Sequence, residues 1–149
     1  MLSQTAQTPD AVARVRGGTA YPGIRGTVKF HSRCGGTLIT ADLCGLPETE
    51  TNFFAFHIHE GSDCGGEAFA DYKGHYNPRD VLHPSHAGDL PPLLAHGGKA
   101  HLQVFTGRFR VCDVIGKTVL IHEHPDDFHT QPAGNPGQKI ACGVIRAVR

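Results

Sequence analysis

Histidine is unusually abundant in this chain, and its spacing indicates metal binding. The sequence has 11 histidines in 149 residues, and imidazole is the commonest protein ligand for transition metals. His57 and His59 stand two residues apart in the apolar run FAFHIH. If this run is a β-strand, both side chains leave the same face and can reach one ion. Taken alone, the pair is also compatible with two polar residues on a solvated strand face.

A second set of potential ligands follows in a segment rich in Gly, Pro and Asp. The run GHYNPRDVLHPSHAGDLPPL contains three histidines and a carboxylate close together in sequence, namely His75, His83, His86 and Asp89. Zinc commonly takes four nitrogen and carboxylate-oxygen ligands in a tetrahedron. Metal binding would also supply the order that such a loop cannot obtain from packing. The alternative is a solvated histidine-rich loop.

A further histidine, His122, follows the apolar run TVLI. At the end of a strand it can direct its ring into a site bordered by loops. Together with His57 and His59 it would provide nitrogen ligands for a second ion. Such ligands suit copper better than magnesium or calcium, which prefer oxygen. A purely structural zinc domain that acts as an interaction module, with these three histidines idle, is the alternative.

The elements that must position these residues are short and extended. Alternating apolar residues, separated by Gly and Pro turns, predict eight strands: 12–15, 24–30, 36–43, 53–59, 100–105, 109–111, 118–121 and 140–148. The irregular segments 60–92 and 122–138 are long enough to be functional loops. The composition, with 19 Gly and 10 Pro, disfavours helix. We therefore expect an all-β fold, an eight-stranded Greek-key β-barrel or sandwich with two long functional loops.

Charge and hydropathy limit the classes of partner. Lys plus Arg equals Asp plus Glu at 14 each, so the net charge recommends neither a nucleic acid nor an anionic membrane as a partner. No apolar run approaches the roughly 20 residues of a membrane-spanning helix. The first ten residues are polar and lack the features of a secretory signal. We expect a flexible segment at 1–10, one domain at 11–149, and a cytoplasmic protein as written, or a periplasmic or extracellular one if a signal was removed.

Five blocks of the sequence resemble, in order, the signatures of the copper/zinc superoxide dismutase family, and HAGDLPPL is similar to the bacterial branch. The blocks are FAFHIHE, GHYNP, HAGDLPPL, VIGKTVLIHEHPDD and GNPGQKIACGVIRAV, and the resemblance covers about residues 12–148. It implies an antioxidant oxidoreductase that disproportionates superoxide to dioxygen and hydrogen peroxide by copper redox cycling beside a structural zinc. Copper and zinc are then the cofactors and superoxide is the substrate. Dimers are common in the family, which makes a homodimer a possible assembly.

The resemblance also implies a role for each ligand. The implied copper ligands are His57, His59, His75 and His122. The implied zinc ligands are His75, His83, His86 and Asp89. His75 is thus the imidazolate that bridges the two metals, and its release and protonation on copper reduction would give it a catalytic role as a proton donor. The segment before His83 is shorter than in most relatives, so a purely structural His83 is the alternative.

Further residues match supporting positions of the family. Asp126 matches a carboxylate that holds one copper ligand and one zinc ligand in place, and Asp127 is the competing candidate. Cys64 and Cys142 match the intrasubunit disulfide. The remaining cysteines could form a second bridge or, as is commoner in a reducing compartment, stay as buried free thiols. They are Cys34, Cys44 and Cys112.

The clearest departure from the family pattern is Lys139, which stands where the family usually carries a catalytic arginine that guides the anion to copper. Lysine keeps the charge but loses the planar fork of donors, so we expect attraction to be retained and orientation to be weakened. This departure favours one alternative, a copper-binding or copper-delivery protein on the same scaffold with little turnover. The histidines that match no ligand are expected at the surface: His31, His96, His101, His124 and His129.

Overall fold

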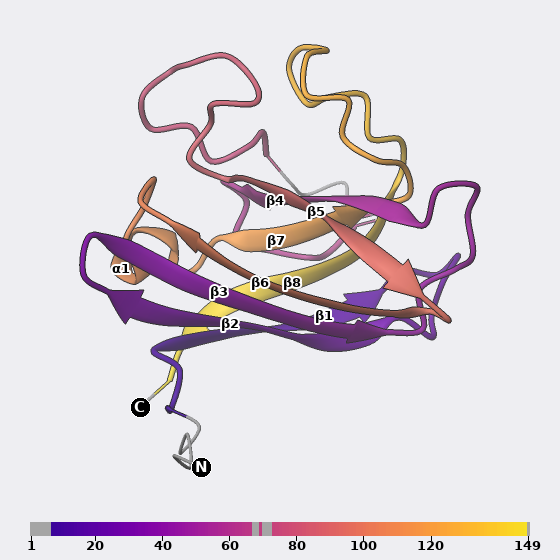
Figure 1. Cartoon of the computed structure of the whole chain (residues 1–149), viewed down its shortest axis with the longest axis horizontal. Coiled ribbons are helices and arrows are strands. Elements are labelled where there is room, and N and C mark those ends of the chain that lie inside the picture. Colours follow the sequence, from indigo (N-terminus) through magenta and orange to yellow (C-terminus); the bar gives the residue numbers. More distant parts are fainter. Residues whose placement is uncertain (1–6, 67–68, 70–72, 149) are drawn as a thin grey trace.

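The computed structural model describes residues 7–66, 69 and 73–148, and its strands close into one antiparallel barrel (Figure 1). The described strands are β1 (Ala11–Gly17), β2 (Arg25–Arg33), β3 (Gly36–Cys44), β4 (Phe53–His59), β5 (Asp89–His96), β6 (Lys99–Thr106), β7 (Thr118–His122) and β8 (Lys139–Ala147). Their order around the barrel is β1-β2-β3-β6-β5-β4-β7-β8, with β8 closing on β1. The expected all-β barrel is confirmed.

Alternation along the strands fills the barrel with apolar side chains. In β1, Ala11, Ala13 and Val15 are buried while the residues between them face outward, as the two-residue period of a strand requires. In β4, Phe56 and Ile58 belong to the same core and are fully buried. Because the interior is occupied by the core, any site must lie outside the barrel wall.

One predicted strand is wrong, because residues 109–111 pair with no strand. Phe109 and Val111 are buried, but the chain turns into the short helix α1 (Val111–Val114). The carboxylate of Asp113 accepts a hydrogen bond from the backbone N–H of Arg110 at 2.8 Å and so caps this turn. The apolar residues at 109–111 are therefore buried, but their backbone does not form a β-strand.

The sequence pattern does not predict strand β5. It predicts a loop over residues 60–92, but this loop ends at Gly88. Pro91 and Pro92 make this segment look unlike a strand, because proline has no N–H to donate to a neighbouring strand. The structure accommodates both prolines because the ladder with β4 shifts register at this place, between Phe54 and Phe56. Consequently Asp89 is the first residue of a strand and not a loop residue.

Two long connections separate β4 from β5 and β7 from β8, and their described parts within 73–88 and 123–138 rise on the same side of the barrel above β4 and β7 (Figure 1). The first of them carries three of the seven predicted ligands, His75, His83 and His86. Of the predicted N-terminal segment 1–10, residues 1–6 lie outside the described residues. Among the residues that the structure describes, no helix has the length and apolar character to cross a membrane.

Candidate metal centre

Strands β4 and β7 present three histidines beneath the two long connections. His57 and His59 leave β4 on the face opposite the core residues Phe56 and Ile58, and they are 0% and 2% exposed. His122 ends the adjacent strand β7. The centroid of its ring lies 5.8 Å from that of His57 and 6.0 Å from that of His59. The predicted pairing of His57 and His59 on one face is thus present in the fold.

The backbone of the first connection fixes His75 against β4. Tyr76 donates a backbone hydrogen bond to the carbonyl of Ile58 at 2.8 Å, and His75 forms an isolated bridge with His59. The ring centroids of His57 and His75 are 4.1 Å apart. Ligand atoms of His57, His59 and His75 lie within 4.8 Å of one another, and we call these three residues the nitrogen group.

His75 also belongs to a second group, in which the common partner is a carboxylate. Its Nδ1 lies 2.8 Å from Oδ1 of Asp89. The other oxygen of Asp89 lies 3.1 Å from Nδ1 of His83 and 3.2 Å from Nδ1 of His86. All four residues have ligand atoms within 4.8 Å of one another, and we call them the mixed group. Three imidazoles and one carboxylate form a typical zinc ligand set.

Asp126 connects the two groups. Its two carboxylate oxygens lie 2.8 Å from Nε2 of His57 and 2.8 Å from Nε2 of His83. The backbone N–H of Phe128 donates to the same carboxylate at 2.7 Å, and Asp126 is buried. Because His57 and His83 each donate their Nε2–H to Asp126, the lone pair of each ring is on Nδ1 and is available to a metal.

The competing candidate Asp127 contacts none of these histidines. Its side chain accepts hydrogen bonds from the backbone N–H groups of His129 and Thr130 and from the Thr130 hydroxyl. These contacts shape the second connection locally. The structure therefore brings Asp126, and not Asp127, to the histidines.

Burial keeps His59 and His122 neutral. It lowers the pKa of His59 to about 2, with a further contribution from the neighbouring His75. It also lowers the pKa of His122 to about 4. Burial acts in the opposite direction on Asp126, but hydrogen bonds from His57 and His83 outweigh it and bring the pKa of that carboxyl to about 2. At neutral pH these groups are neutral imidazoles around an ionised carboxylate, which is the state that binds metal cations.

Several of these nitrogens have no hydrogen-bond partner among the described residues, although they are buried. They are Nδ1 of His57, Nε2 of His75, Nδ1 of His83 and Nε2 of His122. Buried polar atoms without partners are rare and costly, and two metal ions, one in each group, would satisfy these four lone pairs. The residues present therefore fit a nitrogen-rich copper site and a zinc site that share His75.

Backbone carbonyls select the tautomers of two further rings, those of His59 and His122. Nδ1 of His59 lies 2.6 Å from the carbonyl oxygen of Lys73, and Nδ1 of His122 lies 3.1 Å from that of Gly137. A ring that donates from Nδ1–H keeps the lone pair on Nε2. Both rings are thus prepared to bind a metal through Nε2.

Lys139 begins β8 directly opposite His122, at a register shift in the β7–β8 ladder. It is half-buried. Its charge is among the smaller causes, after burial, that lower the pKa of His122. A cation therefore lies beside His122.

A disulfide between Cys64 and Cys142 joins the first connection to β8, so the predicted pairing is present. The other three cysteines are free. The expectation of buried thiols is wrong for Cys34 and Cys112, which are exposed because they lie in the tight β2–β3 turn and on α1. Cys44 is half-buried.

The histidines that match no ligand are exposed in four cases, His96, His101, His124 and His129. His31 is the exception, because it is only 9% exposed. Its Nε2 lies 3.0 Å from the carbonyl oxygen of Gln7. The residues before β1 pack beside it, a long-range contact that local sequence does not reveal.

Two residues that sequence reasoning missed support the site. Arg108, in the turn after β6, donates from Nη1 to the carbonyl oxygens of Pro84 and His86, each at 3.0 Å. Gly134 has φ +81°, and a Cβ there would lie 2.0 Å from Oδ1 of Asp126. Neither has a recognisable sequence signal, since both act on residues far away in the chain.

Comparison with known proteins agrees with this geometry. The family model for copper/zinc superoxide dismutase (SODC) matches residues 24–145. Superoxide dismutase [Cu-Zn] of Legionella pneumophila is 33% identical over 154 residues, which cover 98% of this chain and 93% of that protein. Superoxide dismutase [Cu-Zn] 2 of Aquifex aeolicus (strain VF5) is 37% identical over 126 residues, covering 74% and 72%. The relative from Deinococcus radiodurans is 32% identical over 146 residues, covering 84% and 79%. This chain therefore belongs to the copper/zinc superoxide dismutase family.

Proposed function

We propose that this protein disproportionates superoxide to dioxygen and hydrogen peroxide. The observation that carries the proposal is His75, which belongs to both the nitrogen group and the mixed group. The proposed copper ligands are His57, His59, His75 and His122. The proposed zinc ligands are His75, His83, His86 and Asp89. Copper, when bound, supplies the one-electron chemistry that the reaction requires, and zinc supplies a fixed positive charge.

The residues of the chain have two tasks in this proposal. Asp126 orients His57 and His83 through its two oxygens, so that one carboxylate aligns a ring of each group. His75 has Nδ1 directed to Asp89 and a buried Nε2 without a hydrogen-bond partner among the described residues. We propose that this Nε2 holds and releases a proton that the peroxide product needs.

Lys139 is proposed to attract the anionic substrate. It lies opposite His122 in the β7–β8 ladder, and a lysine ammonium acts as a point charge without the bidentate fork of arginine. Electrostatic attraction of superoxide is therefore retained, while the orientation of the anion is left to other contacts.

The first experiment is a superoxide disproportionation assay on purified protein in which copper and zinc are quantified on the same sample. We expect turnover per bound copper well above that of free copper, and loss of this turnover in His122→Ala. Metal binding with turnover no higher than free copper would instead indicate the copper-binding or copper-delivery alternative.

We further propose that the protein is a homodimer through the outer face of β4, β5 and β6. Phe53 and Leu94 are opposite each other across β4 and β5 and are 39% and 56% exposed. Phe105 and Phe128, with 52% and 50% exposure, line a neighbouring hollow. Large exposed apolar side chains gathered on one face are typical of a protein interface. Sedimentation analysis of Leu94→Glu tests this, with a shift to monomer as the expected result.

The disulfide supports a location in an oxidising compartment, such as the periplasm or the cell exterior, because such bonds are rare in the cytosol. Fractionation of cells that express the protein, with a thiol-trapping assay of Cys64 and Cys142, tests this proposal. Recovery in the cytosolic fraction with both thiols reduced would contradict it.

A further inference from the structure

Positive charge gathers on the outer face of three adjacent strands, β8, β1 and β2. These strands contain no Asp or Glu, although the whole chain has 14 acidic residues. Their exposed basic residues on this side form what we call the basic face: Arg14, Arg16, Arg25, Lys29 and Arg146. The described acidic residues therefore lie outside these three strands.

The register of the strands brings like charges together on this face. Arg16 lies directly opposite Arg25 in the β1–β2 ladder. Val12 is flanked by Lys29 on one side and Arg146 on the other. Like charges directly opposite each other destabilise a sheet. Within residues 7–66, 69 and 73–148, no carboxylate forms an ion pair with these five cations, so a bound anion would relieve the repulsion.

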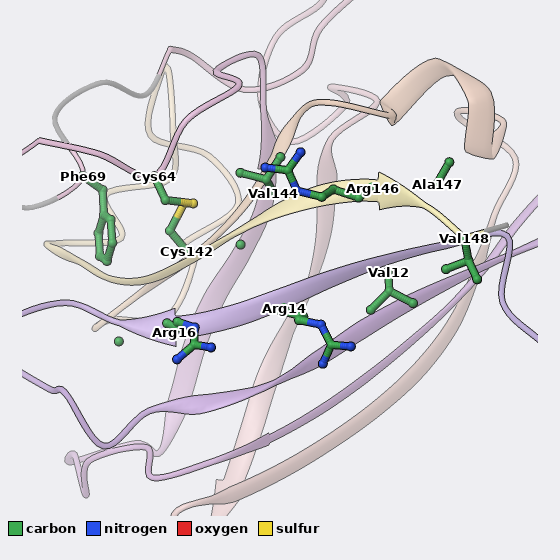
Figure 2. A pocket seen from close by; sticks show the side chains of 12 residues that line it. Val12, Arg14, Arg16, Cys64, Phe69, Cys142, Val144, Arg146, Ala147 and Val148 are labelled. Atoms are coloured by element: carbon green, nitrogen blue, oxygen red, sulfur yellow. A yellow bond between two sulfur atoms is a disulfide. The ribbon is translucent and has the colours of Figure 1, made fainter.

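Three of these arginines surround a hollow of about 550 Å³ between β1 and β8. Figure 2 shows Phe69 and the Cys64–Cys142 disulfide at one end of the hollow and Val12 and Val148 at the other. Arg14 and Arg146 lie between these two ends, and Arg16 lies beside Cys142 at the disulfide end. The volume is in the range of small-molecule sites, roughly 300–1,000 Å³.

The hollow combines two kinds of lining that together define its ligand. Guanidinium groups present a planar fork of N–H donors that matches phosphate oxygens. Val12, Val144, Val148 and Phe69 provide apolar surface beside these donors. We propose that the hollow binds an organic phosphate, with the phosphate held by the arginines and an apolar group packed against the valines and Phe69.

A second copy of the chain does not fit the basic face. A two-fold dimer brings the same patch of each subunit together, and here that contact would oppose five cations with five cations. The face therefore suits an anionic ligand. The site is separate from the metal ligands and does not depend on the proposed function.

Calorimetric titration of the metal-loaded protein with phenyl phosphate tests the proposal. We expect phenyl phosphate to bind at least about tenfold more tightly than inorganic phosphate or benzyl alcohol. Only phenyl phosphate has both a phosphate for the arginines and an apolar ring for the valines and Phe69. The double variant Arg14→Gln/Arg146→Gln should weaken binding by about tenfold or more. Arg33→Gln removes a charge from β2 outside the hollow and should change the affinity by less than about twofold.

Phenyl phosphate should also raise the midpoint of thermal unfolding of the wild type and leave that of the double variant unchanged. Equal affinity of wild type and double variant would overturn the proposal. So would an equal loss in Arg33→Gln, or tighter binding of a polyglutamate peptide than of phenyl phosphate.

Vesicles distinguish the two sources of an organic phosphate. Co-sedimentation with phosphatidylglycerol vesicles, absent with phosphatidylcholine vesicles and lost in the double variant, would support the proposal with a lipid headgroup as the ligand. Binding of phenyl phosphate without any vesicle binding would support it with a free molecule as the ligand. Vesicle binding that persists in the double variant would count against the hollow.

Discussion

The guanidinium of Arg108 lies 3.0 Å from the main-chain oxygen of His86, so a residue after β6 holds the backbone of a proposed zinc ligand. The same nitrogen binds the carbonyl of Pro84. The segment that carries His83 and His86 is thus attached to the barrel through Arg108. This arrangement leads to the first prediction.

Replacing Arg108 should weaken zinc binding. In Arg108→Gln both carbonyls lose a charged donor, and we expect zinc affinity to fall by about tenfold, the lower end of the range for partners of metal ligands. Competition with a zinc chelator measures this. Arg79→Gln is the matched control, because Arg79 is exposed and forms no hydrogen bond among the described residues. Equal affinities of the two variants would show that Arg108 has no such role.

Asp126→Asn should weaken both metal sites together. His57 and His83 contact different oxygens of Asp126, and in Asn one of these oxygens is replaced by an NH2 donor, so one of the two rings loses its acceptor. We expect the affinity for zinc and for copper to fall by about 10- to 100-fold. Asp127→Asn serves as the control, since its contacts are confined to the second connection. Metal competition assays on both variants provide the measurement, and a loss at only one site would contradict a bridging role.

Gly134→Ala should damage the site more than its backbone conformation explains. A Cβ at Gly134 would meet Asp126 at 2.0 Å. Gly116 has a similar φ of +84° but nothing within 4 Å of the added atom. Gly116→Ala should therefore cost about 1 kcal/mol of unfolding free energy, while Gly134→Ala should also lower zinc affinity by about tenfold or more. Equal zinc affinities in the two variants would exclude the contact with Asp126 as the cause.

The metal-free protein should lose stability as the pH falls below about 6.5. His59 and His122 have folded pKa values of about 2 and about 4, depressed chiefly by burial. Below the unfolded value the unfolded chain binds protons that the folded chain does not, so unfolding becomes more favourable on acidification. Each histidine should contribute about 1.4 kcal/mol per pH unit, for His122 down to about pH 4.

Urea unfolding of the metal-free protein between pH 6.5 and 4.5 measures this slope. Substitution of the exposed His124 by Gln should leave the slope unchanged, whereas His122→Gln should reduce it. A stability that does not vary over this range would contradict the burial of neutral imidazoles.

Lys139→Arg should increase superoxide turnover at low substrate concentration. Arginine keeps the charge and adds a planar pair of donors that can orient an oxygen anion. Lys139→Gln should reduce the turnover and flatten its dependence on ionic strength. Rate measurements at two salt concentrations give both quantities, and equal rates for the three proteins would exclude a role for this side chain.

Sequence patterns predicted which residues gather in the candidate metal centre more accurately than they predicted the strands around it. His57 and His59 lie on one predicted strand, His122 directly follows another, and the run from His75 to Asp89 contains the whole mixed group. Local spacing was enough to find these residues, because most of them stand only two or three residues from another ligand in the sequence. In contrast, Arg108 and Gly134 support the site through contacts that span many residues of chain.

The errors have equally specific causes. Pro91 and Pro92 concealed β5, and burial of Phe109 and Val111 resembled a strand. A net charge of zero concealed the basic face, because the sum over the chain says nothing about where the charges lie. The strand register that opposes Arg16 and Arg25 is a property of the folded barrel alone.

The two prolines of β5 have a further consequence. β5 pairs with β6 only at Ala95 and His96, so the first part of β5 forms a seam in an otherwise closed barrel. An open strand edge is a template on which another chain can add by backbone hydrogen bonds. Pro91 and Pro92 have no N–H to offer, and this seam is therefore a poor starting point for the strand exchange that leads to aggregates.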